Sequence, residues 1–113
     1  MINEIQKEIF NLVPEAIDEV PADFDFKKDN AIEIKIADNI TNKFYLDDIT
    51  LQIRIVGLKN NKFNIQDIAE NLDKKINKAR FINCRVVREN AWYTSYYDED
   101  KFNVVLQYLI KRI

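Results

Sequence analysis

The residue types that usually carry enzymatic chemistry are scarce in this chain of 113 residues. It contains no histidine, the commonest general base, and its one serine, Ser95, lies among aromatic residues without an evident base. A phosphate-binding loop needs several glycines, and Gly57 is the only one. The single cysteine, Cys84, has apolar neighbours and is expected to be a small core residue. We therefore predict no catalytic residue, no cofactor and no enzymatic activity.

Two runs of carboxylates are the remaining candidates for a metal site. Residues 98–100 read Asp-Glu-Asp, and Asp47 is followed by Asp48. Hard cations prefer oxygen ligands, but neither run has the alternate-residue ligands and the glycine of a calcium loop. Residues 97–101 also fall between two predicted strands, where aspartates are common in turns. We therefore predict no specific metal site.

The charge balance argues against binding nucleic acid as the main role. The formal net charge is -2 and the pI about 5.2, whereas a protein that neutralises phosphates normally has a basic excess. The one basic group follows the apolar stripe of a predicted helix, where cations stabilise the helix dipole; it comprises Lys74, Lys75, Lys78 and Arg80. Helix stabilisation explains this group more simply than a phosphate site does.

A run of large aromatic residues is the best candidate for a protein interface. Successive side chains of a strand face opposite ways, so these residues cannot all enter one core. Tyrosine and tryptophan are enriched where proteins meet. Packing on the flanks of the sheet and stacking on RNA bases are the alternatives. A second candidate is the mixed face of the last predicted strand; together the candidates are Trp92, Tyr93, Tyr96, Tyr97, Val105 and Leu109.

The N-terminal part of the chain predicts a helix and then an irregular segment. Apolar residues recur at helical spacing over residues 2–13, and Pro14 disfavours continuation. This helix is expected to pack on the domain's own sheet, because its mixed polar face does not suit a membrane surface. Residues 14–30 hold both prolines and many acids, and form either an extended arm against a neighbour or a loop over the domain's own core.

No targeting or membrane-spanning segment is expected. The first residues alternate charged and apolar types without an unbroken apolar centre, unlike a signal peptide. No stretch approaches the roughly 20 apolar residues of a membrane span. The chain is therefore expected in a reducing cytoplasm, or in an assembly that is made there.

The remaining pattern predicts an α+β domain over residues 1–113. Alternating apolar residues indicate strands over 32–36, 49–55, 83–93 and 102–112, with a bulge near Glu89 and Asn90. Residues 64–79 form an amphipathic helix, with Asn64 as N-cap and Asp67 as a short capping-box acid. The order α-β-β-α-β-β predicts a two-layer sandwich, in which helices cover one face of a four-stranded, mainly antiparallel sheet. The strand order stays open.

In the order and residue pattern of these segments the chain resembles the tail terminators and minor capsid proteins of long-tailed bacteriophages and prophages. After the N-terminal helix and the proline-containing stretch, the segments that carry the resemblance are DNAIEIKIAD at 29–38, ITLQIRIVGLKN at 49–60, NIQDIAENLDKKINK at 64–78 and RVVRENAWYTSYYDEDKFNVVLQYLIKRI at 85–113. An acidic turn between the last two strands is typical of such sequences.

The resemblance implies a structural protein of the virion that catalyses no reaction. Such proteins form a ring, commonly a hexamer, on the head-proximal end of the tail tube. The ring stops tube polymerisation and offers a docking surface to head-completion proteins, and DNA passes through its lumen. Another small head–tail connector or tail component is the neighbouring alternative. A small regulatory or nucleic-acid-binding module is the alternative from a different class.

Overall fold

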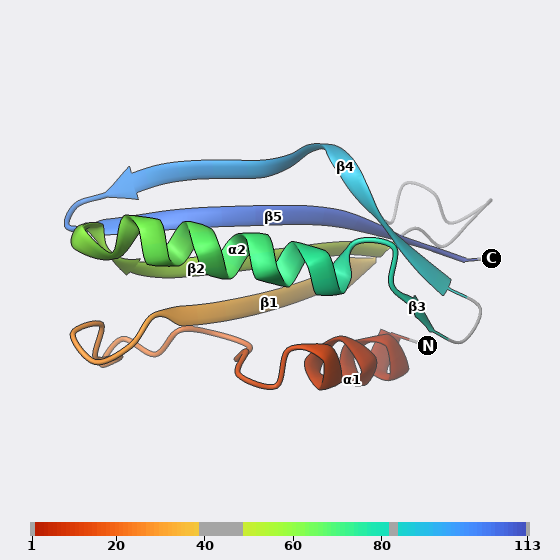
Figure 1. Ribbon diagram of the computed structural model, residues 1–113. Helices are drawn as coiled ribbons and strands as arrows, with labels where there is room; N and C mark the ends of the chain where they lie inside the picture. The colour runs from red at the N-terminus through yellow and green to blue at the C-terminus, as the bar shows by residue number, and fades with distance from the viewer. Residues whose placement is uncertain (1, 39–48, 82–83, 113) are drawn as a thin grey trace.

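Two pairs of long antiparallel strands and two helices make up the computed structural model, which describes residues 2–38, 49–81 and 84–112 (Figure 1). The elements in chain order are α1 (Ile2–Leu12), β1 (Ala31–Asp38), β2 (Ile49–Leu58), the 3-10 turn η2 (Lys59–Asn61), α2 (Lys62–Ile76), β3 (Arg80–Phe81), β4 (Cys84–Asp98) and β5 (Lys101–Arg112).

The strands form one antiparallel sheet in the order β1-β2-β5-β4-β3. This confirms the predicted α+β class and fixes the strand order that the sequence left open. The two-residue β3 is an addition to the four predicted strands. The most buried strands, β2 and β5, lie side by side in the centre, with Ile53 opposite Leu106. The β4–β5 pair is closed by a two-residue turn, in which Glu99 has a φ of 55°.

One face of the sheet carries the hydrophobic core. Along β2 the residues Ile49, Leu51, Ile53 and Ile55 are buried, while the residues between them on the other face, from Thr50 to Arg54, are half-buried. This is the period-two alternation that the sequence predicts for a strand with one covered face. In β5 the corresponding buried residues are Phe102, Val104, Leu106, Tyr108 and Ile110.

Both helices contribute to this one core. The helix α2 covers one face of the sheet and runs along β2 and β5, and α1 lies beside β1 (Figure 1). Ile9 of α1 and Ile65 of α2 are fully buried in the same apolar cluster. The predicted placement of helices on one face is therefore confirmed. Neither helix in the described ranges is long and apolar enough to cross a membrane.

The start of α2 differs from the prediction. The helix begins at Lys62, so Asn61 occupies the N-cap and Asn64 lies inside the first turn. No side chain caps this end by a hydrogen bond. The preceding turn η2 leads directly into the helix and fixes its direction, because the Lys62 amide bonds the Lys59 carbonyl. The proposed capping box was therefore wrong, although the helix itself was predicted correctly.

The segment 14–30 follows the outer edge of β1. The Ile17 amide donates to the Ile32 carbonyl at 2.8 Å, and the Ile34 amide donates to the Ile17 carbonyl at 3.0 Å. The buried Glu33 carboxylate accepts from the Val20 amide at 3.1 Å and pairs with Arg54 at 3.3 Å. Part of this segment thus covers a strand edge of its own chain. A contact with a neighbour remains a prediction.

Candidate functional site

The strand β4 changes direction where the sequence predicts a bulge (Figure 1). Arg88 pairs with Tyr108, but the next pair is Tyr93 with Leu106, so residues 89–92 lie opposite Gln107 alone. Such an insertion bends a strand and redirects the side chains that follow it. The bulge therefore separates the β4 residues under the end of α2 from the aromatic second half of the strand.

The aromatic residues lie within β4 and not at its end. The sequence places the end of this strand near residue 93, but pairing with β5 continues to Asp98. Tyrosine and threonine favour a pleated, half-covered surface, and the tight turn at residues 99–100 keeps the two strands in register. Residues 93–98 are therefore paired with β5 without interruption.

Pairing with β5 divides the exposed tyrosines between the two faces of the sheet. Tyr93 and Tyr97 lie opposite Leu106 and Phe102, whose side chains belong to the core, so these two tyrosines are on the helix side. Tyr96 is on the other side. Their exposed fractions are 40% for Tyr93, 57% for Tyr97 and 42% for Tyr96. Two aromatic surfaces therefore point in opposite directions from one strand.

The other three interface candidates are less accessible. Trp92 packs against the core, and the Arg88 guanidinium lies 4.0 Å from its ring centroid. Val105 is buried, with 7% of its surface exposed, and Leu109 is half-buried. These residues stabilise their own chain in the structure. Replacing Trp92 would therefore disturb the fold as well as any interface.

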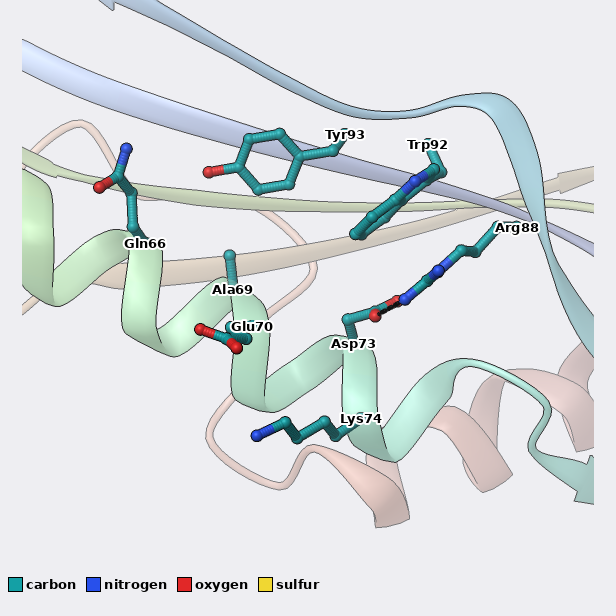
Figure 2. Close-up of a pocket in the computed structure, with 8 residues that line it drawn as sticks. All are labelled: Gln66, Ala69, Glu70, Asp73, Lys74, Arg88, Trp92 and Tyr93. Carbon is teal, nitrogen blue, oxygen red and sulfur yellow. Dashed lines mark hydrogen bonds and ion pairs between the residues drawn. The ribbon is translucent and has the colours of Figure 1, made fainter.

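A groove of about 470 Å³ lies between α2 and β4. Trp92 and Tyr93 extend from β4 toward the helix, and Arg88 reaches across to Asp73 (Figure 2). The lining residues are Gln66, Ala69, Glu70, Asp73, Lys74, Arg88, Trp92 and Tyr93. The groove exists because α2 packs over the central strands, which leaves the helix side of β4 largely uncovered.

The buried carboxylate of Asp73 in α2 contacts both strands of the β4–β5 hairpin. It accepts a hydrogen bond of 2.7 Å from the Tyr108 hydroxyl and one of 3.2 Å from Arg88 Nε, and it also forms an ion pair with Arg88 Nη2. The hydrogen bond with Asp73 raises the pKa of Arg88. Burial, reinforced by Asp73, raises the pKa of the Tyr108 hydroxyl well above its usual range. This network satisfies the buried charge and holds Arg88 beneath Trp92.

Sequence reasoning missed Asp73 and Arg88. A signal for Asp73 was present, because it falls within the apolar stripe of α2, next to Leu72 and four residues after Ala69. A carboxylate on a buried helix face needs a partner in the core. Its partners could not be found from the sequence, because they come from two strands that the chain reaches later.

The next residues to locate are the carboxylate runs and the cysteine for which the sequence predicts no functional site. Asp100 lies in the β4–β5 turn, where a 3.1 Å hydrogen bond from Lys101, reinforced by the positive charge of Lys101, lowers the pKa of Asp100. Asp47 and Asp48 lie outside the described residues. Within residues 2–38, 49–81 and 84–112, no cluster of three or more cysteine and carboxylate side chains could hold a metal ion. Cys84 is buried, as predicted.

Comparison of the sequence with protein-family models finds no match, and comparison with curated proteins finds none either.

Proposed function

We propose that this chain is a non-enzymatic structural protein of a bacteriophage or prophage, a tail terminator that caps the tail tube and joins it to the head as a ring. The order of the sequence segments first motivates this proposal. In this proposal the chain is assembled in the bacterial cytoplasm and acts in the virion, at the junction between tail and head. Its partners are further copies of the chain, the tail tube protein and the head-completion proteins.

The observation that carries the proposal is the division of exposed tyrosines between two faces of β4. A ring is built from head-to-tail contacts, so each subunit must present two different surfaces to its neighbours. Tyr93 and Tyr97 form one such surface on the helix side, and Tyr96 forms another on the opposite side. Exposed tyrosines on a paired strand suit a protein interface, because they bury a large area at little entropic cost.

The charge of the chain is consistent with this role. DNA has to pass through the lumen of such a ring without being held, and a chain of net charge -2 offers no general attraction to phosphates. The second candidate, another small head–tail connector or tail component, draws on the same surfaces. The regulatory or nucleic-acid-binding alternative would favour a basic excess, and the net charge of the chain is -2.

The proposal is tested by the growth of tail tubes in vitro. The chain is added to the polymerising tail tube protein encoded by the same genome, and tube lengths are measured by electron microscopy. We expect short tubes that carry a ring at one end. Tubes of undiminished length without an end ring would exclude a tail terminator.

Two single substitutions assign the surfaces. Tyr97→Ser and Tyr96→Ser each remove one exposed ring, on opposite faces of β4, and each is expected to raise the concentration needed for capping by about tenfold or more. Glu8→Ser, at an exposed position of α1, is the matched control and should leave capping unchanged. If all three variants cap equally well, the tyrosines do not contribute to the contact between subunits.

A further inference from the structure

The outer edge of β4 has no backbone partner over most of its length. The short β3 pairs only with Cys84 and Arg85, and Val86 exchanges hydrogen bonds with residues 78 and 79. From residue 87 to residue 98 the described part of the chain provides no strand on this side. In an antiparallel ladder alternate residues direct their N–H and C=O groups away from the partner. This edge therefore presents a row of unpaired donors and acceptors.

The two outer edges of the sheet are protected to different extents. The outer edge of β1 is partly covered by Ile17, which bonds Ile32 and Ile34. Free edges are usually defended by lysines, prolines, bulges or a covering segment, because they otherwise pair with another chain. Residues 93–97 read Tyr-Thr-Ser-Tyr-Tyr, without charge, proline or glycine, and the bulge ends before them. This five-residue edge is open to a further strand.

We propose that the occupant of this edge is the same edge of a second copy, paired antiparallel about a two-fold axis at Ser95. In this register Ser95 lies opposite Ser95 of the partner subunit, and Tyr93 lies opposite Tyr97 of the partner subunit. Thr94 then lies opposite Tyr96 of the partner subunit. In this register, residues whose backbone N–H and C=O groups point out of one copy lie opposite residues of the other copy with the same orientation. The hydrogen bonds of an antiparallel pair can therefore form.

The chemistry of the segment is self-complementary in this register. Cross-strand aromatic pairs stabilise antiparallel ladders, and Tyr93 and Tyr97 supply such a pair on each side of the axis. Residues 93–97 carry no charge, so no like charges meet in this pairing. A pairing centred nearer Trp92 would bring the bulge into the ladder, whereas the proposed one uses only the part of β4 that is regularly paired with β5.

This inference goes beyond the proposed function. A two-fold contact uses the same patch on both subunits, and it cannot join successive neighbours around a cyclic ring. The pair is therefore a form of the free chain, and it is expected whichever head–tail assembly the chain belongs to.

The first test is the mass of the purified full chain, measured by light scattering over a range of concentrations. We expect a species of twice 13.4 kDa. Ser95→Lys places two ammonium groups opposite each other at the axis and should shift the protein to monomer, with at least a tenfold weaker association. Asn71→Lys adds the same charge at an exposed position of α2 and should leave the dimer intact. Far-UV circular dichroism checks that both variants fold.

The second test fixes the register by disulfide formation. Residues directly opposite each other in an antiparallel pair have Cα atoms about 4.5–5.5 Å apart, within the range that a disulfide bridges. Ser95→Cys should therefore cross-link two copies under mild oxidation. Tyr97→Cys is the control and should not, because each Tyr97 lies opposite Tyr93 of the partner subunit. The natural Cys84 is buried and does not compete.

The outcomes separate this inference from the proposed function. A dimer that is lost in Ser95→Lys and cross-linked only in Ser95→Cys supports the pairing. A monomer at every concentration, or equal cross-linking of both cysteine variants, overturns it, and the tube-capping assay still decides the function. A six-subunit ring without the Ser95→Cys cross-link overturns the pairing and favours the tail terminator.

Discussion

The ionisation of Tyr108 is coupled to the stability of the fold. It is fully buried, and its hydroxyl donates to the Asp73 carboxylate. Both burial and the neighbouring carboxylate oppose a second negative charge, which is why its pKa is raised. A tyrosine that ionises in the unfolded chain but not in the folded one couples folding to alkaline pH.

We predict that the free energy of unfolding falls above pH ~10, the ordinary pKa of tyrosine, by up to about 1.4 kcal/mol per pH unit from this residue. The sign follows from the raised pKa: the stabilising effect is present below the unfolded-state pKa and is lost as the pH rises. Tyr108→Phe should flatten this slope in urea titrations at pH 7 to 11.

The same variant has a second effect at neutral pH. Tyr108→Phe removes one hydrogen bond to a buried carboxylate and should cost about 1–3 kcal/mol. Tyr96→Phe removes a hydroxyl from an exposed tyrosine and serves as the control, with little change expected. An alkaline slope that is identical in the natural chain and in Tyr108→Phe would contradict the role assigned to Tyr108.

Among the elements, Gly57 is a position of β2 at which an added side chain would meet two neighbouring side chains. A Cβ atom there would lie 2.1 Å from Asn30 Oδ1 and 2.9 Å from Ile65 Cδ1. The glycine thus lets the end of segment 14–30 and the helix α2 approach the same strand. The sequence predicts this strand only over residues 49–55, but β2 continues through Gly57 to Leu58.

We predict that Gly57→Ala lowers the free energy of unfolding by about 1–3 kcal/mol, because a methyl group is forced into a packed contact. Thermal unfolding monitored by circular dichroism measures the loss. Lys59→Ala, at an exposed position of the adjoining turn η2, is expected to change little. A Gly57→Ala variant as stable as the natural chain would mean that Asn30 can move aside freely.

For the whole molecule, one apolar cluster joins elements from both ends of the chain. Ile9 of α1, Ile65 of α2 and Ile110 of β5 are buried in it together. No element could keep its apolar face covered if the others left, so unfolding is expected to be cooperative.

We predict a single unfolding transition for the chain. Trp92 is the only tryptophan and reports on the contact between β4 and α2, whereas far-UV circular dichroism reports on all elements. Urea titrations followed by the two signals should give coincident midpoints. An earlier fluorescence midpoint would show that β4 leaves the core before the remainder unfolds.

The two helices, the four long strands and the covered faces of β2 and β5 could be predicted from the sequence. Alternation in β2 and β5 and the stripe of α2 report which side chains must leave water, and this depends on local periodicity alone. The bulge in β4 was also readable, because an insertion shifts that period. The start of α2 was not, because a 3-10 turn that leads into a helix leaves no clear signal.

The strand order, the partners of Asp73 and the faces on which the exposed tyrosines lie could not be predicted from the sequence. Each depends on contacts between residues far apart in the chain. Pairing with β5 sends Tyr93 and Tyr97 to one face and Tyr96 to the other. The position of β4 beside the two-residue β3 leaves its edge open. An unpaired edge results from what lies next to a strand in space, and the residues of that strand cannot record it.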